Sequence, residues 1–303
     1  MPGAAISTLT LNPALDVTTC TDKVHDTHKM RCSAPRFDPG GGGVNVARVI
    51  HALGGDVTAV FPQGGPTGET YTTLLRDAGL AIAQVKIAGA TRESFTVDEG
   101  ETGLQYRFVL PGPELSDAEV DALIAAIPTC DYLVVSGSLP PGCDPAIIKR
   151  LGELDTKLVV DTSGPALAAC EGAGVYLLKP SLREVEDLIG APIKGEAEEL
   201  KAARTLRERG FAEVIILSLA ERGALLVADG TELRLPAISV ETRSAVGAGD
   251  SLVGAVTLAL ANGKPLADAL RYGIAAGAAT RMTPATELAR REDVERLYAA
   301  SSA

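Results

Sequence analysis

Short runs of β-branched residues and leucine recur along the chain, and turn-forming residues bound each run. Runs of this length and composition are typical of strands that are buried in a sheet. We predict strands at Ile6–Leu11, Val57–Phe61, Tyr132–Val135, Lys157–Val160, Val175–Leu178, Val214–Leu217 and Ala224–Val227. A sheet built from such runs is expected to be covered on both faces.

Most segments between these strands carry apolar residues at helical spacing. An example is the predicted helix that ends at Gly54–Gly55, whose apolar face consists of Val46, Val49, Ile50 and Leu53. Strands that alternate with helices indicate βαβ units and a mainly parallel sheet. The hydrophobic pattern therefore predicts an α/β fold.

Two segments, Pro13–Asp38 and Ala90–Leu110, depart from this alternation. In the second, Phe95–Val97 and Gln105–Phe108 alternate apolar and polar residues with no helix between them, as antiparallel strands do. We interpret both segments as one small β-sheet outside the main sheet. It could cover a site as a lid or close a dimer, or it could be an edge without a role in function. One domain over residues 1–303, with a lid formed by these two segments, is expected.

The net charge of −11 argues against broad binding to nucleic acids or anionic membranes, because both require a basic surface. Hydrophobic residues make up 46% of the chain and charged residues 22%, as in an ordinary globular protein. The five cysteines form no CxxC pair, so neither a zinc site nor a disulfide framework is predicted. We expect a soluble protein of the reducing cytoplasm.

The first candidate site is the run Gly40–Gly43, which leads directly into a predicted helix. Consecutive glycines let the backbone approach a ligand closely, and the free N–H groups of a first helical turn favour an anion or a hydroxyl group. Asn45 adds a donor and an acceptor that suit a polyol. The alternative is a helix entry that only needs unusual backbone dihedrals.

A second glycine-rich turn, Gly247–Asp250, leads into another predicted helix, which Asn262–Gly263 ends. Its N–H groups could receive the charge of a phosphoryl group in transfer, while Asp250 accepts a proton from an attacking hydroxyl. Asp250 could instead be an ordinary helix cap. Neither glycine turn has the spacing of a P-loop or of a dinucleotide-binding fingerprint, which disfavours those enzyme classes.

Basic residues gather in or beside the small predicted sheet of this acidic chain. Guanidinium groups bind phosphate in a bidentate manner, so the clustering suits a phosphate-bearing substrate. For any single member, solvated surface charge is the alternative. The residues are Lys29, Arg31, Arg36, Arg92 and Arg107.

These segments together make the chain resemble the ribokinase-like, or PfkB, family of carbohydrate kinases. The motifs that carry the resemblance are Asn12–Asp16, Gly40–Arg48, Ser136–Gly142, Asp161–Gly164, Lys179–Pro180 and Gly247–Asp250. Within the family the chain looks most like the bacterial second-isozyme type of 6-phosphofructokinase, notably at Arg36–Arg48, Gln105–Val109 and Val246–Ser251. The resemblance implies a three-layer αβα fold with a mainly parallel central sheet and a small β-sheet lid.

The resemblance also implies a role for each matching residue. Asp250 falls at the position of the general base, and Gly247, Ala248 and Gly249 at the anion hole. Substrate-binding positions fall at Asp16, Lys29, Gly41, Gly42, Gly43, Asn45, Arg92, Arg107 and Ser138, of which Lys29 and Arg92 face phosphate groups. ATP-binding positions fall at Lys179, Ser181, Ser218, Ala220, Glu221, Gly223 and Gly277, a magnesium-linked position at Glu184, and a monovalent-cation (K⁺) position at Ser244 and Val246.

The implied reaction is transfer of the γ-phosphoryl group of ATP, with Mg²⁺, to the 1-hydroxyl of fructose 6-phosphate. A sugar phosphate and ATP are thus the expected ligands, and a homodimer joined through the lid is the expected assembly. Asp250 is expected to be ionised at pH 7, because a carboxylate is acidic and a helix N-terminus lowers its pKa further. It would then be a weak base, which a loose phosphoryl-transfer transition state tolerates.

Two departures from the family pattern bear on substrate and metal. Sister kinases usually carry a lysine where this chain has Gly42, which favours fructose 6-phosphate over fructose 1-phosphate or tagatose 6-phosphate as the substrate. The family's Asn-x-x-Glu motif reads Ser181–Glu184 here, and the shorter serine is expected to alter metal affinity. A sugar-phosphate sensor without turnover and a nucleotide-dependent oxidoreductase are the alternatives from other classes.

Overall fold

The computed structural model describes residues 4–284 and 286–301, and a nine-stranded sheet forms its centre. The strand order is β13-β12-β11-β10-β9-β8-β1-β4-β5. The bounds are β1 Ile6–Leu9, β4 Val57–Gln63, β5 Ala81–Lys86, β8 Tyr132–Ser136, β9 Lys157–Asp161, β10 Leu177–Leu178, β11 Val214–Ser218, β12 Ala224–Ala228 and β13 Thr231–Leu235. From β5 to β11 along this order the strands are parallel, whereas β12 and β13 are antiparallel additions. The predicted mainly parallel sheet is confirmed.

Every strand expected from the apolar runs is present, although β10 is reduced to Leu177–Leu178. The apolar runs do not predict β5 and β13. Both lie at an edge of the sheet and are only partly buried, so they lack the continuous apolar character of an inner strand. The loop between β12 and β13 is the dipeptide Asp229–Gly230, which is itself a strong hairpin signal.

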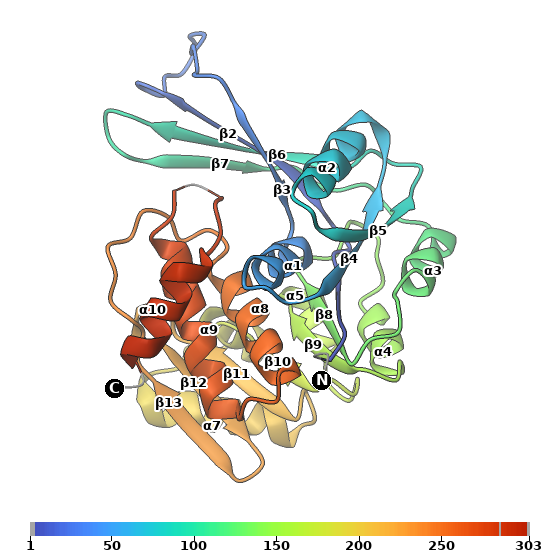
Figure 1. The fold of residues 1–303 in the computed structure, drawn as a ribbon, viewed down its shortest axis with the longest axis vertical. Helices are drawn as coiled ribbons and strands as arrows, with labels where there is room; N and C mark the ends of the chain where they lie inside the picture. Colours follow the sequence, from blue (N-terminus) through green and yellow to red (C-terminus); the bar gives the residue numbers. More distant parts are fainter. Residues whose placement is uncertain (1–3, 285, 302–303) are drawn as a thin grey trace.

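Helices cover both faces of the main sheet (Figure 1). Helices α1, α2, α8, α9 and α10 share one hydrophobic core with the sheet, and α3 to α7 share another. The bounds are α1 Gly42–Ala52, α2 Gly65–Asp77, α3 Asp117–Ala125, α4 Ile147–Gly152, α5 Gly164–Ala168, α6 Leu182–Ile189, α7 Gly195–Glu208, α8 Ala248–Ala261, α9 Leu266–Arg281 and α10 Arg291–Ser301, with a 3₁₀ turn η1 at Ala220–Arg222. Within the described ranges, no helix combines the length and apolar character needed to cross a membrane. The three-layer αβα fold is confirmed.

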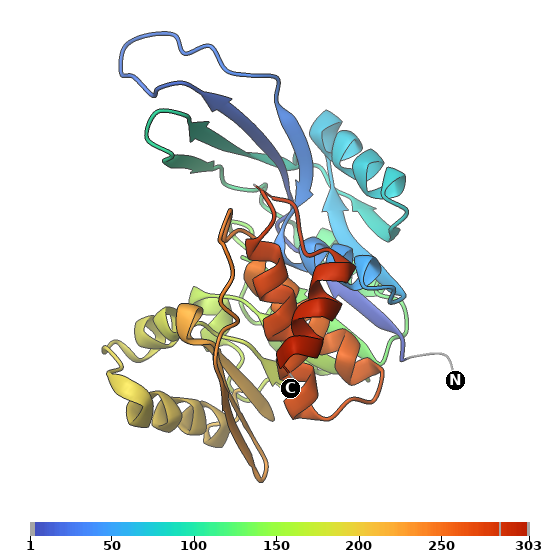
Figure 2. The same ribbon diagram turned by 60° about the vertical axis from the view of Figure 1, so that its left-hand side comes forward.

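A second, four-stranded sheet has the order β3-β2-β6-β7 and projects from one end of the three layers (Figure 1 and Figure 2). Its strands are β2 Ala14–Thr21, β3 Arg36–Gly40, β6 Arg92–Glu99 and β7 Gln105–Val109. The two segments predicted to form one small sheet do so, and β6 and β7 are antiparallel as expected. The central pair, β2 and β6, is parallel, which neither segment reveals alone. We call this element the small sheet.

Helices α1 and α8 both begin at the carboxyl edge of the main sheet and pack closely against each other. Gly254 of α8 permits this approach, since an added Cβ would lie 3.1 Å from the carbonyl oxygen of Val46 in α1. The packing brings the two predicted glycine turns together at the edge where ligands bind in open α/β sheets. The fold therefore places both candidate motifs in one site.

Candidate active site

The run Gly40–Gly43 passes so close to β1, β2 and β8 that side chains would not fit. A Cβ at Gly42 would lie 2.6 Å from the backbone nitrogen of Gly137, and one at Gly43 would lie 2.5 Å from Thr10 Oγ1. Gly41 has a φ of +110°, a conformation that favours glycine. Packing within the protein thus explains why most positions of this run are glycine. A lysine at Gly42 would require the Gly137 backbone to move.

Asp250 lies in the first turn of α8 but does not cap that helix. The N-cap is Gly247, whose φ of +77° is left-handed. The Asp250 carboxylate instead accepts hydrogen bonds from other elements: Asn45 Nδ2 donates at 2.9 Å and Ser136 Oγ at 3.3 Å. These partners contradict the helix-cap alternative.

Burial raises the pKa of Asp250 to about 7, and the nearby carboxylate of Asp161 adds to the rise. Hydrogen bonds from Asn45 and Ser136 and the charge of Lys179 lower this pKa without cancelling the rise. The expectation of a lowered pKa is therefore wrong, because loss of solvation outweighs the field of the helix N-terminus. Part of Asp250 still faces a cavity, so it can meet a ligand.

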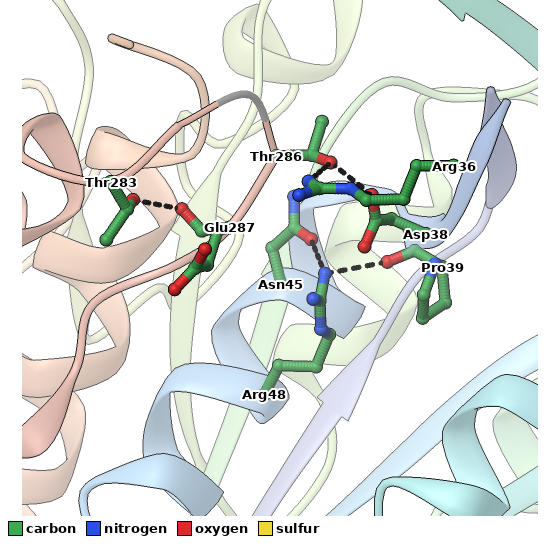
Figure 3. A network of polar contacts seen from close by, with 8 residues as sticks. All are labelled: Arg36, Asp38, Pro39, Asn45, Arg48, Thr283, Thr286 and Glu287. Atoms are coloured by element: carbon green, nitrogen blue, oxygen red, sulfur yellow. Dashed lines mark hydrogen bonds and ion pairs between the residues drawn. The ribbon is translucent and has the colours of Figure 1, made fainter. Parts of the chain in front are cut away.

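Arg48 orients the side chain of Asn45 (Figure 3). Its Nη1 donates to Asn45 Oδ1 at 3.4 Å and to the carbonyl oxygen of Pro39 at 3.0 Å. With its oxygen held by a cation, the Asn45 amide presents Nδ2 to Asp250. The hydrogen bond from Asn45 Nδ2 supports the ionised form of the Asp250 carboxylate. The sequence assigns no separate role to Arg48.

A cavity of about 320 Å³ lies between the small sheet and the first turn of α8. Gly247 and Asp250 line its α8 side. The predicted substrate-binding residues that it collects are Asp16, Gly41, Asn45, Arg92 and Arg107. We call it the acceptor cavity, after the ligand predicted for it.

Asp16 and Arg92 give the acceptor cavity a mixed charge. Burial raises the pKa of Asp16 to about 6, against the opposing charge of Arg92 and with a further rise from Asp38. Arg92 donates from Nη1 to the carbonyl oxygen of Leu110 at 3.0 Å and from Nη2 to that of Asn12 at 3.1 Å. A cation fixed by backbone carbonyls beside a carboxylate suits a ligand that carries both phosphate and hydroxyl groups.

The remaining predicted substrate-binding residues are not part of the acceptor-cavity lining in the described chain. Lys29 lies in the exposed loop between β2 and β3, which extends away from the main sheet (Figure 1). Gly42 and Gly43 are packed against neighbouring backbone and side chains, and Ser138 is exposed and accepts a hydrogen bond from Asn12 Nδ2 at 3.1 Å. Their roles in binding stay predictions.

A second cavity, of about 640 Å³, lies beyond the first turn of α8. The predicted ATP-binding residues that line it are Ser181, Ser218, Ala220, Glu221, Gly223 and Gly277. Its apolar lining includes Leu182, Ile238, Leu252 and Ile274. A cavity of this size with an apolar wall and a few polar groups suits a purine nucleotide. We call it the nucleotide cavity.

The turn Ala220–Gly223 forms one wall of the nucleotide cavity, and a buried carboxylate holds it. Ala220 has a φ of +53°, a left-handed conformation that costs a non-glycine residue roughly 1 kcal/mol or more. Glu199 of α7, with only 1% of its side chain exposed, binds Arg222 at 2.5 Å and Arg234 at 2.8 Å. These pairs tie the strained turn to α7 and β13.

Lys179 supplies a fixed positive charge beside the first turn of α8. Its Nζ lies 3.0 Å from Asp161 Oδ1, and a Cβ at Gly249 would be 3.7 Å from the same Nζ. Burial alone would lower the pKa of Lys179, but Asp161, followed by Glu184 and Asp250, raises it. The ammonium group therefore stays charged although the residue is buried.

Ser181 and Glu184 form a capping box on α6. Glu184 N donates to Ser181 Oγ at 3.3 Å, and Ser181 N donates to Glu184 Oε2 at 2.7 Å. Serine is a good residue for this role, so the departure from the family's asparagine preserves the helix start. Among the described residues, no group of three or more His, Cys, Asp or Glu side chains is placed to hold a metal. Magnesium keeps several waters and binds substrate phosphates, so a single carboxylate can hold it. Glu184 accepts from Ser181 N through Oε2 and is not among the residues that line the nucleotide cavity in the described chain, so it would reach the ion through water.

The first turn of α8 separates the two cavities. Gly247 and Asp250 line the acceptor cavity, whereas Ala248 and Gly249 line the nucleotide cavity, and Ala245 lines both. A group that passes between the cavities must pass the N–H groups of this turn, which favour negative charge. The arrangement therefore suits transfer of an anionic group between two ligands, with Asp250 on the receiving side.

A larger open hollow, of about 770 Å³, lies elsewhere, around Val175–Tyr176 and Glu213–Val214. These residues stand at the beginning of β10 and β11, at the amino edge of the parallel strands. Ligands of open α/β sheets bind at the opposite, carboxyl edge. The chemistry of the lining residues, rather than the size of the cavity, therefore identifies the candidate active site.

Besides Arg48, three site residues have no role of their own in the sequence interpretation: Ser136, Asp161 and Thr286. Ser136 and Asp161 are the last residues of β8 and β9. A polar residue directly after a buried apolar run marks the carboxyl edge of a parallel sheet, so the signal for both is present in the sequence. Thr286 follows α9 in an irregular segment, where no spacing rule indicates its contacts.

The chain is similar to known carbohydrate kinases over nearly its whole length. The family described as pfkB family carbohydrate kinase matches residues 10–291. The ATP-dependent 6-phosphofructokinase isozyme 2 of Mycobacterium tuberculosis is 48% identical over 301 residues, which cover 97% of this chain and 88% of that protein. The 1-phosphofructokinase of Haloferax volcanii is 37% identical over 295 residues, or 95% of each chain.

Solved structures of phosphofructokinase-2 from Escherichia coli share the fold. The complex with potassium has a TM-score of 0.94 at 39% identity, and the complex with fructose-6-phosphate has a TM-score of 0.93 at 38% identity. Each comparison covers 99% of this chain and 100% of that chain. A further structure of the same protein is described as its tetrameric inhibited form.

Proposed function

Because the chain belongs to the pfkB family of carbohydrate kinases, we propose that it transfers the γ-phosphoryl group of ATP to the 1-hydroxyl of fructose 6-phosphate. The products are fructose 1,6-bisphosphate and ADP. One observation carries the proposal: the first turn of α8 divides a charged cavity from a partly apolar one, with Asp250 on the charged side. The name of the M. tuberculosis relative supports the same reaction.

In the proposed mechanism, Asp250 accepts the proton of the sugar hydroxyl as that oxygen attacks the phosphoryl group. A pKa of about 7 matches this task near neutral pH, since the group is then available as a base and strong enough to take the proton. Backbone N–H groups of Gly247–Gly249 stabilise the phosphoryl charge in transit. Lys179 balances charge on the nucleotide side of the same turn.

Glu184 is the residue proposed to hold Mg²⁺, mainly through water. The ion, when bound with ATP, neutralises charge on the phosphates. Ser244 and Val246, directly before α8, are proposed to bind K⁺, which the potassium complex of the E. coli protein supports. Val246 N donates to Ser244 Oγ at 3.2 Å, so the two residues already form one tight turn.

The choice of fructose 6-phosphate rests on the acceptor cavity and on Gly42. Arg92 and Arg107 from the small sheet are placed to bind the phosphate of the sugar. Phosphorylation of fructose 1-phosphate or tagatose 6-phosphate is the second candidate, which the similarity to a 1-phosphofructokinase favours. We place the enzyme in the cytoplasm, where free cysteines are stable.

We further propose that the small sheet is a lid and that its outer face joins two copies of the chain. Phe37, Val17, Phe95 and Phe108 are aligned across its strands in one row. Phe37, Phe95 and Phe108 are 45%, 36% and 55% exposed, which is unusual for a row of large apolar side chains. Burial of such a row against a second copy would remove apolar surface from water.

The test is release of ADP, measured by a coupled assay with phosphorylated and free hexoses as acceptors. Fructose 6-phosphate should give the highest kcat/KM, and fructose 1,6-bisphosphate should form in equal amount with ADP. A higher kcat/KM for another sugar phosphate would reassign the substrate. Binding of sugar phosphate without ADP release would instead indicate the sensor alternative.

A further inference from the structure

The segment between α9 and α10 touches both the small sheet and Gly247, the N-cap of α8, although it belongs to neither element. We propose that Thr286 in this segment is a positioning residue, which fixes the small sheet relative to the first turn of α8. The proposal rests on the proposed function for its kinetic consequences. Its structural consequence, a small sheet that is less firmly held, does not depend on that function.

The hydroxyl group of Thr286 is held from two sides by β3 (Figure 3). Arg36 Nη2 donates to Thr286 Oγ1 at 2.9 Å, and Thr286 Oγ1 donates to Asp38 Oδ2 at 2.6 Å. Arg36 and Asp38 also bind each other at 2.7 Å. The hydroxyl therefore completes a cycle of charge-assisted hydrogen bonds, which are stronger than bonds between neutral groups.

Two residues further on, at Leu288, the same segment contacts Gly247 at the start of α8. A Cβ at Gly247 would lie 2.5 Å from Leu288 Cδ2, so the Leu288 side chain packs directly on this glycine. Leu288 is only 8% exposed and belongs to the hydrophobic core. Thr283 Oγ1 lies against the carbonyl oxygens of Thr280 and Glu287, which holds the segment to the end of α9.

The contacts of Thr286 with β3 and of Leu288 with Gly247 form a bridge between the small sheet and α8. This bridge matters because each of its ends carries part of the acceptor cavity. The small sheet contributes Asp16, Arg92 and Arg107, and α8 contributes Asp250. Thr286 lines the same cavity between them. The distance between the bound sugar and its base therefore depends on how firmly the bridge holds, and small displacements at a reacting centre have large effects on rate.

The principal test replaces Thr286 with valine, which keeps the shape of the side chain and removes the hydroxyl. Thr19→Val is the matched control, because Thr19 Oγ1 also makes a hydrogen bond in the small sheet, to Ser33 O, away from the bridge. Thr286→Val should lower kcat/KM for fructose 6-phosphate by about 10-fold, as for loss of a hydrogen bond to a charged group. KM for ATP should change by less than about twofold, and ADP release should exceed sugar phosphorylation. Thr19→Val should match the wild type.

Hydrogen exchange in the absence of substrates provides the structural readout. In Thr286→Val the backbone amides of Arg36–Asp38 and Gly40 should exchange faster than in the wild type, while those of the main sheet should not change. Thr286→Ser, which restores the hydroxyl, should recover both readouts. Arg36→Met removes a partner that is 43% exposed, so it tests the same bridge if the valine variant does not fold.

Unchanged exchange of the β3 amides in Thr286→Val, or in Arg36→Met where the valine variant does not fold, would overturn the proposal. Equal losses of kcat/KM for both substrates, with faster exchange throughout the chain, would reduce Thr286 to a residue of general stability and also overturn it. If the wild type phosphorylates no sugar phosphate, the proposed function fails. The exchange experiment still decides whether Thr286 fixes the small sheet.

Discussion

The acceptor cavity and the nucleotide cavity lie on either side of one helical turn, yet they are built in different ways. The acceptor cavity depends on ionisable side chains that burial perturbs, Asp16 and Asp250, and on the fixed cation Arg92. The nucleotide cavity depends on backbone turns and apolar walls, with one strained residue at Ala220. Ligand binding in the acceptor cavity should therefore depend on the charge state of its side chains. Ligand binding in the nucleotide cavity should depend on the shape of its backbone.

The two cavities also come from different parts of the chain. The nucleotide cavity is lined by residues 181–281, which follow one another through successive strands and helices. The acceptor cavity joins residues 14–109 to residues 245–286, so it exists only when the small sheet lies correctly against α8. The difference predicts that changes to pH or to the small sheet affect sugar binding and transfer, and leave ATP binding largely unchanged.

The largest effect is expected from Asp250→Asn, which removes the base and preserves the shape of the side chain. Steady-state kinetics should show kcat lower by at least about 10²-fold, with KM for ATP unchanged within about twofold. In the folded protein the pKa of Asp250 is about 7, above the ordinary value of 3.8 for an aspartate side chain. Its ionisation therefore destabilises the fold progressively as pH rises from about 4 to 7, and the variant should unfold at a higher temperature than the wild type at pH 8.

Asp229→Asn is the control for this experiment, because Asp229 is fully exposed at the β12–β13 hairpin. It should change neither kcat nor the unfolding temperature appreciably. Normal turnover in Asp250→Asn would remove the proposed base from the mechanism. An unfolding temperature at pH 8 no higher than that of the wild type would contradict the raised pKa.

The next effect is the pH dependence of the wild type. With a pKa of about 7 for Asp250, kcat/KM for the sugar should fall about 10-fold from pH 8 to pH 6, because the ionised fraction of the base falls by that factor. Asp16, whose pKa is about 6, should steepen the loss at lower pH. Binding of ATP, measured by calorimetry over the same range, should vary much less. An apparent pKa near 4 would show that burial does not control Asp250.

A smaller effect, on the opposite side of α8, is expected from Glu199→Gln. Removal of this buried charge weakens the pairs with Arg222 and Arg234 that hold the Ala220–Gly223 turn. KM for ATP should rise about 10-fold, roughly the effect of one lost charged hydrogen bond, while KM for the sugar stays within about twofold. Glu232→Gln in β13, which breaks an exposed pair with Arg204 of α7, is the matched control. Equal shifts in both KM values would contradict the separation of the two cavities.

The smallest effect is expected from Ser181→Asn, which restores the family's residue. Asparagine and serine cap helices about equally well, so the stability of α6 should hardly change. The sequence led us to expect an altered metal affinity, but Ser181 Oγ accepts from Glu184 N in the capping box. Titration of Mg²⁺ at fixed ATP should therefore give half-saturation within about twofold of the wild type. A shift of about 10-fold or more would mean that Ser181 acts on the metal as well as on the helix.

The apolar runs predict the inner strands well because an inner parallel strand must be apolar on both faces, whatever its neighbours are. The edge strands β5 and β13 escape the same rule because one side of each is solvated. The parallel pairing of β2 with β6 joins segments about seventy residues apart. A periodic pattern within one segment carries no information about which distant segment pairs with it.

The candidate site, like the fold, could be predicted only in part from the sequence. The motifs single out Asp250, Asn45 and Asp16, and the structure gathers these three around the acceptor cavity. Six of the seven predicted ATP-binding residues line the nucleotide cavity, whereas Lys179 is buried beside Asp161 and is not among the lining residues in the described chain. The glycine run at Gly40–Gly43 is required by packing against Asp16, Thr10 and Gly137, which no local rule reveals. The roles of Lys29 and Ser138 stay predictions, since neither lines the acceptor cavity among the described residues.

By itself, the sequence determined the inner strands, the helices that follow the two glycine turns and the carboxylate that begins α8, because these depend on residue type and local spacing. The tertiary structure alone decided the charge state of Asp250 and the contacts of Thr286. A pKa depends on the solvent and charges that surround a group, and the groups around Asp250 come from β8, β9 and α1. The hydrogen bonds of Thr286 span 248 and 250 residues. Only packing of the whole chain brings such partners together.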